Sequence, residues 1–176
     1  KRTTSSFSAR VLPAGCRVSD LANLVYDEDH GFLFRLLPVL SSSAFQYLLE
    51  ASLPSIDSSA GGTAARHYEV GTLREAPVPI DLPSSLEFAG KELWCIATNR
   101  YRNDEASGYF LPPEYRGCKS LDLLSEELYC SHEDEAVRAI EMHAKVDKEL
   151  YESYGFSTST KSSASDYLGP HPGTVP

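Results

Sequence analysis

Residues 92–97 have the sequence ELWCIA, and their interpretation decides the fold class of this 176-residue chain. After the first residue the run is continuously apolar, with no polar position to mark a solvent-facing side. A short apolar run of this kind is typical of a strand that is buried on both faces. We therefore predict a strand over residues 92–97.

The segments that flank this strand also favour extended structure. Residues 67–73 and 78–82 contain Val, Ile and Tyr and are punctuated by Pro and Gly. Proline cannot donate to a strand ladder, so the prolines between positions 77 and 83 indicate edge strands or extended connections. The polar residues 99–108 predict a turn, with the chain returning through 109–111. Together these runs predict a small, mainly antiparallel sheet in the middle of the chain.

Helical patterns precede the predicted sheet. Ser19 is a candidate N-cap for a first helix that continues to about residue 25. The apolar residues 32–37 predict a second helix that stops at Pro38. A third helix is expected from the serines at 41–43 to Pro54, because its apolar residues recur at three- and four-residue spacings.

Helical patterns also follow the sheet. Ser120 can cap a short helix that ends near Tyr129, and Ser131 then begins the clearest amphipathic helix in the chain. Gly155 suits the position just after its C-terminus. Helices at both ends and a sheet between them predict the α+β class, with extended tails.

The predicted domain organisation has three parts. Residues 1–10 form a basic, Ser/Thr-rich tail, whose composition resembles that of an organelle transit peptide or its remnant. Residues 11–156 form a single α+β domain. Residues 157–176 form a low-complexity tail that lacks the apolar residues for a core of its own.

The charge balance limits the classes of partner. The formal net charge is −9, so the chain lacks the basic face that nucleic acid or an anionic membrane surface requires. We expect no transmembrane segment, because charged residues and Pro38 interrupt the most apolar stretch, residues 31–53. Peripheral contact with membrane subunits remains compatible with that stretch.

Cys16 is the only candidate nucleophile that we single out. It lies just before the first predicted helix, where the helix dipole would favour a thiolate. With His67 or His30 as the base, it could serve a small papain-like cysteine hydrolase. A buried or unreactive structural thiol is the simpler interpretation, because cysteine and histidine occur together in most chains.

Neither a metal site nor a cofactor site is predicted. Residues 27–30 and 132–135 each join carboxylates to a histidine, but consecutive residues on a helix do not converge on one ion. Helix capping and a solvated turn explain these two clusters. Glycine-rich patterns for nucleotide phosphates are also missing from the sequence.

Two short segments are candidate partner-binding sites. Pro112, Pro113 and Tyr115 belong to a P-P-x-Y sequence, which a WW domain can bind as a polyproline II strand. In the C-terminal tail we assign partner contacts to Tyr167 and Leu168.

These observations favour a non-catalytic accessory or scaffold subunit of a large multiprotein assembly. Polar tails can become ordered by wrapping along neighbouring subunits, which here would be other proteins. The basic start favours a mitochondrial, inner-membrane-associated energy-converting complex, and the acidic charge disfavours a ribosome. The alternatives are a viral capsid or cementing protein and the cysteine hydrolase that uses Cys16.

Overall fold

The protein is all-α in the part of the chain that the structure describes. The structure is a computed structural model, and it describes residues 3–4, 7–12, 15–18, 23–53, 66–102, 104–111 and 120–165. These residues contain six helices and one pair of two-residue strands, which run in the order β1 (Thr3–Thr4), α1 (His30–Ser41), α2 (Ser43–Ser52), β2 (Arg66–His67), α3 (Val70–Glu75), α4 (Ser85–Tyr101), α5 (Leu121–Ser153) and α6 (Thr158–Ser165). The predicted α+β class is therefore wrong.

The predicted central sheet is replaced by helices. Residues 92–97 lie inside α4, and α3 occupies most of the segment 67–73. The run 92–97 is not buried on both faces, since Trp94 keeps 36% of its surface exposed and Cys95 is exposed. Leu86, Ala89 and Gly90 are the buried residues of α4, and their spacing is helical. A six-residue apolar run does not by itself distinguish a strand from part of a longer helix.

The strand pairing that the structure does contain is minimal. β1 and β2 pair antiparallel, with Thr3 opposite His67 and Thr4 opposite Arg66. The predicted hairpin at 99–111 does not form in its described residues, because 99–101 belong to α4 and 104–111 contain turns and no strand. A single hydrogen bond, from the N–H of Leu111 to the carbonyl of Arg102 at 2.9 Å, closes this loop.

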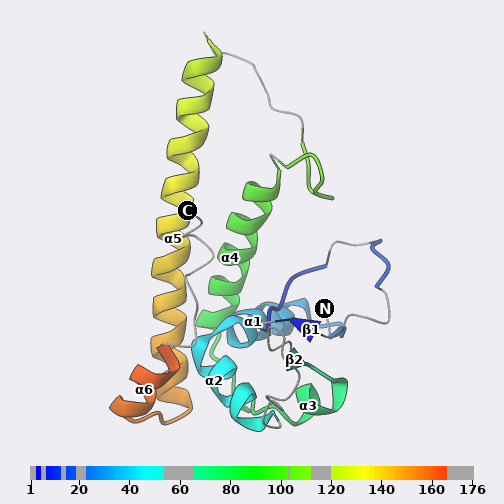
Figure 1. Ribbon diagram of the computed structural model, residues 1–176, viewed down its shortest axis with the longest axis vertical. Helices are drawn as coiled ribbons and strands as arrows, with labels where there is room; N and C mark the ends of the chain where they lie inside the picture. Colours follow the sequence, from blue (N-terminus) through cyan, green and yellow to red (C-terminus); the bar gives the residue numbers. More distant parts are fainter. Residues whose placement is uncertain are drawn as a thin grey trace, which may run out of the picture.

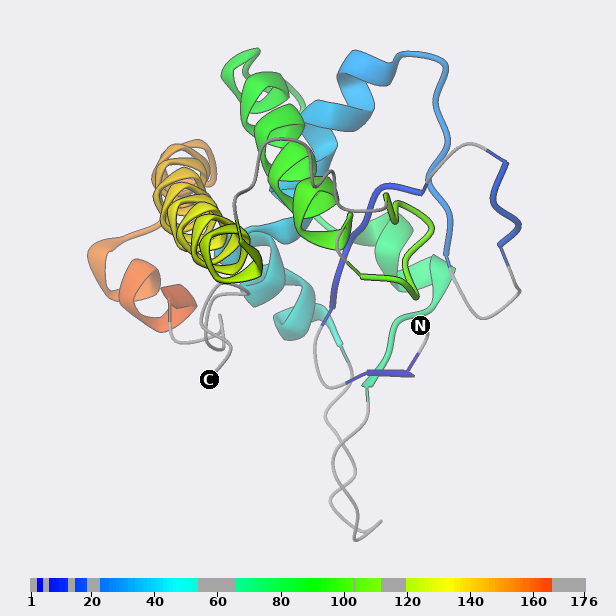
Figure 2. The ribbon, with the colours of Figure 1, turned by 90° about the horizontal axis from the view of Figure 1, so that it is seen from above.

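The other helices are arranged along α5, the longest helix of the described residues. α5 stands along one side of the molecule, α4 runs beside it, and α1, α2 and α3 gather near its C-terminal end (Figure 1). Seen from above, α4 lies between α5 and α1 (Figure 2). At about 1.5 Å per residue, the 33 residues of α5 extend for about 50 Å, about twice the length of the 17-residue α4.

α5 is one helix where two were predicted. Ser120 caps it as expected, because its Oγ accepts a hydrogen bond from the N–H of Leu123 at 3.3 Å. Ser131 does not begin a second helix, since it lies within the continuous helix and is exposed. The good helix formers around it continue the preceding helix, and Ser131 has no proline or glycine next to it to interrupt the backbone.

The C-terminus of α5 is closed by the predicted glycine. Gly155 has a positive φ of 66°, and its N–H bonds to the carbonyl of Glu152 at 3.1 Å. The N–H of Phe156 bonds to the carbonyl of Tyr151 at 2.9 Å, and the two rings stack with centroids 5.7 Å apart. These two bonds and the apolar contact form a Schellman motif, which reverses the chain toward α6.

The core lies where α1, α2, α4 and α5 meet. The predicted third helix is confirmed as α2, which buries Phe45 and Leu49. Val146 and Leu150 of α5 are buried against them. Asp147 lies between these two residues, and its Oδ1 accepts a hydrogen bond from the N–H of Ser43, the first residue of α2, at 2.9 Å.

Both chain ends contribute to this body. Phe7 packs on Phe45 and Tyr68, with ring centroids 5.7 and 5.4 Å away, and its carbonyl accepts a hydrogen bond from Gln46. Within the predicted C-terminal tail, α6 packs beside α2 and buries Ala164 completely. The expectation of an extended tail is therefore wrong for Thr158–Ser165, which form a helix that packs against α2.

Within the described residues no single helix combines the length and apolar composition that crossing a membrane needs. α1 and α2 meet that criterion only when taken together, and the chain bends by 70° between them.

Candidate functional site

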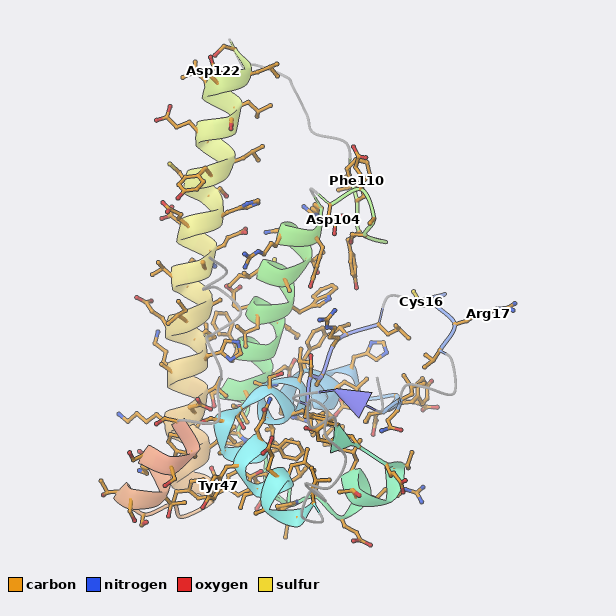
Figure 3. All side chains as sticks on the ribbon, viewed as in Figure 1. Cys16, Arg17, Tyr47, Asp104, Phe110 and Asp122 are labelled. Atoms are coloured by element: carbon orange, nitrogen blue, oxygen red, sulfur yellow. The ribbon has the colours of Figure 1, made fainter. Side chains whose placement is uncertain are left out.

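The structure gives no support to a catalytic site at Cys16. Cys16 is exposed on the irregular segment before α1, away from the helices (Figure 3). The first predicted helix does not form over residues 23–29, and α1 begins only at His30. Among the described side chains, Cys16 has no hydrogen bond or ion pair. His67 lies in β2, and its side chain is outside the described part.

The two carboxylate-rich clusters have structural explanations. Asp29 precedes α1 and forms an ion pair with Arg35 at 3.2 Å, while the Oδ1 of Asp27 accepts the N–H of Asp29 at 2.8 Å. In the second cluster, Glu135 accepts a hydrogen bond from Asn99 of α4 at 3.2 Å. Across the described ranges, no group of three or more His, Cys, Asp or Glu side chains is placed to hold a metal ion.

The predicted partner-binding residues cannot be placed. Pro112, Pro113 and Tyr115 lie outside the described residues, as do Tyr167 and Leu168. A different exposed surface lies on α5, among residues that the structure describes, and it was not predicted from the sequence.

Polar contacts between α4 and α5 define where that surface begins. Ser85 donates to Glu149 at 2.6 Å near the start of α4, and Arg138 bonds to Glu92 at 2.8 Å in its middle. Near the end of α4, Asn99 donates to Glu135 at 3.2 Å. These contacts show that the two helices run antiparallel, and that α4 ends about level with residues 131–133 of α5.

The N-terminal part of α5 therefore extends beyond α4, as Figure 1 shows. Four large apolar side chains on this part and just below it are mostly exposed: Leu121 (73%), Leu123 (53%), Tyr129 (64%) and Val137 (56%). We call residues 121–137 the α5 arm. A soluble helix usually directs its large apolar side chains to the core, so exposed ones on a projecting helix suggest a binding surface.

The α5 arm is strongly acidic. Residues 121–137 contain no lysine or arginine and six carboxylates: Asp122, Glu126, Glu127, Glu133, Asp134 and Glu135. Tyr129 and Glu133 are one turn apart, and the hydrogen bond between them raises the pKa of the Tyr129 hydroxyl above its usual range. The arm therefore combines apolar side chains with a negative field.

Other exposed apolar residues are distributed over separate elements. Among them, Leu24, Val25 and Tyr26 are consecutive on the irregular segment before α1, Ile80 lies between α3 and α4, and Phe88, Trp94 and Tyr101 lie on α4. The α5 arm differs because Leu121, Leu123 and Tyr129 lie on the part of a helix that extends beyond its neighbour α4.

One signal in the sequence could have identified this surface. Leu123, Cys130 and Val137 are spaced by seven residues, which brings them onto one face if a single helix spans all three. Dividing the segment at Ser131 hid this spacing, because it assigned the three residues to two different helices.

In the part of the chain that the structure describes, the fold is a set of helices with a projecting acidic arm. The chain was compared with protein-family models, with curated proteins and with solved structures, and none of these comparisons finds a match.

Proposed function

We propose that the protein is a non-catalytic subunit that binds another protein chain through the α5 arm. The observation that carries this proposal is the exposure of Leu121, Leu123, Tyr129 and Val137 on a helix that continues beyond its α4 neighbour. Exposed apolar groups on such an element are typical of protein–protein contacts.

The energetics of the arm favour a bound state. Covering a half-exposed Leu or Val side chain contributes about 1 kcal/mol, and a larger aromatic contributes more. The part of the arm before about residue 131 has no α4 beside it, whereas most helical stability in proteins comes from tertiary packing. A partner helix would supply the packing that α4 supplies to the C-terminal half of α5.

The proposal also covers the kind of assembly to which the protein belongs and its location in the cell. From the basic and Ser/Thr-rich start we propose that the assembly is a mitochondrial, inner-membrane-associated energy-converting complex, and from the acidic charge that the chain binds other protein subunits and no nucleic acid. Phe7 of this segment belongs to the folded body, because its ring packs on Phe45 and Tyr68. Subcellular fractionation tests the location independently of the binding surface.

The binding proposal is tested on protein purified under native conditions from its source. Size-exclusion chromatography with mass spectrometry should place the chain in a species much larger than 19.4 kDa. A variant with Leu121, Leu123, Tyr129 and Val137 replaced by glutamine should elute as the free chain, because glutamine preserves helix propensity and removes the apolar surface.

The matched control replaces Ile80, which is 99% exposed outside the arm, by glutamine. This variant should remain in the large species. If the native protein elutes as a free monomer, or if the arm variant and the Ile80 variant behave alike, the proposal is wrong.

A further inference from the structure

One face of the α5 arm carries a narrow apolar stripe. Leu123 is 53% exposed, Val137 is 56% exposed, and Cys130 between them is also exposed. The three residues are spaced by seven along a continuous helix, so they lie nearly in line and drift by only about 20° per interval. A seven-residue spacing keeps the three side chains on one face of the helix, so a partner helix that lies along this face covers all three.

Carboxylates border this stripe on both sides. Glu126 and Glu133 follow one edge, and Glu127 and Asp134 follow the other, and all four side chains are exposed. In helices that pair side by side, the charges that flank the apolar seam select the partner. The stripe is thus a hydrophobic contact enclosed by negative charge.

We propose that the stripe binds a basic amphipathic helix of another protein, whose apolar residues cover Leu123, Cys130 and Val137 and whose lysines or arginines meet the two acidic borders. A second copy of this chain is disfavoured, because pairing two arms would bring like charges together. Nucleic acid and an anionic membrane are disfavoured by the same repulsion. This inference rests on the proposed function, since it names the chemistry of the partner that the arm binds.

Cys130 provides a direct reporter for this contact. The test is iodoacetamide alkylation of the native complex and of the free chain, followed by peptide mass spectrometry. We expect the complex to slow alkylation of Cys130 at least 10-fold. Cys16 and Cys95, which are exposed on other elements, should react at unchanged rates and serve as internal controls.

The charge requirement is tested with two synthetic helical peptides of 21 residues. Both carry leucine along one face, and the flanking positions are lysine in one peptide and glutamate in the other. The lysine peptide should bind the full chain and protect Cys130, and the glutamate peptide should not. Replacing Glu126 and Asp134 by lysine should weaken this binding about 10-fold at low salt. Replacing Glu105 and Glu152 by lysine changes the net charge equally outside the stripe and should have little effect.

The outcomes separate this inference from the proposed function. If a complex forms but Cys130 in it reacts as fast as in the free chain, the stripe is not the contact and only this inference fails. If the glutamate peptide binds as well as the lysine peptide, the partner chemistry is wrong. A dimer of the purified chain with Cys130 protected would also overturn the inference. If no complex exists at all, the proposed function itself fails.

Discussion

Replacement of Gly90 by alanine should destabilise the protein, because α4 crosses α1 at this residue with no room for a side chain. A Cβ atom on Gly90 would lie 2.0 Å from the carbonyl oxygen of Phe34 and 3.1 Å from Cδ of Pro38. Pro38 lies inside α1 and has no N–H to donate to the Phe34 carbonyl four residues earlier. That carbonyl oxygen is therefore directed at the backbone of α4, and only glycine accommodates it.

The magnitude follows from two opposing effects. A carbon atom approaches a carbonyl oxygen to about 3.3 Å, so the two helices would have to separate by about 1 Å. Overpacking of this kind costs about 1–3 kcal/mol, and a backbone atom cannot rotate away as a side chain can. Alanine regains about 1 kcal/mol through its higher helix propensity. From the upper end of that cost, about 3 kcal/mol, we expect a net loss near 2 kcal/mol at position 90, which lowers Tm by about 4–8 °C in a chain of 176 residues.

Thermal and urea unfolding of the Gly90→Ala variant measure this effect. Gly71→Ala is the matched control, because Gly71 is also helical and no atom lies within 4 Å of its added Cβ. The control should be neutral or slightly stabilised. If Gly90→Ala proves as stable as the control, the close helix crossing is wrong.

Three further substitutions test the core and its pH dependence. Asp147→Ala should cost about 2 kcal/mol in unfolding free energy, because it leaves the buried N–H of Ser43 without an acceptor, and Asp147→Asn should cost less. Burial raises the pKa of Tyr154 to about 12 from its usual 10.0, so its stabilising contribution is complete below pH 10 and is lost as the pH rises toward 12. The unfolding free energy of Tyr154→Phe should therefore fall less than that of the unmodified protein between pH 10 and 12. Equal pH dependence of the two unfolding free energies would contradict the burial of this hydroxyl. Phe7→Ala should cost about 2 kcal/mol, whereas Phe88→Ala, at a ring that is 64% exposed, should change stability by less than about 0.5 kcal/mol. Equal effects of the two Phe variants would show that the N-terminal segment is not part of the folded body.

Local rules predicted two helix ends correctly, at Ser120 and Gly155, but failed at Ser131, which lies inside α5, and at Pro38, which lies inside α1. Ser120 and Gly155 were both identified from sequence, since an N-cap hydroxyl and a left-handed glycine act on their own neighbours. Prediction failed where tertiary packing decides. Residues 92–97 are helical because the residues before them extend the same apolar face, and α1 passes through Pro38 because α4 covers the exposed carbonyl.

The candidate site was less predictable than the helices. Residues near the start of α5 are exposed because α4 ends at Tyr101 and does not cover them. The sequence of residues 121–137 contains no information on where α4 ends. The seven-residue spacing of Leu123, Cys130 and Val137 is visible in the sequence, but it gains meaning only on one continuous helix.

The hydrogen bond between Asp147 and Ser43 joins residues 104 positions apart, and this separation has a consequence for synthesis of the chain. When α1 and α2 leave the ribosome, the residues that complete their core have not yet been translated. At about 5–20 residues per second, an interval of about 5–20 s passes before Val146, Asp147 and Leu150 follow. During that interval Phe45 and Leu49 are without their α5 partners. We expect chaperones to protect the nascent chain until α5 emerges.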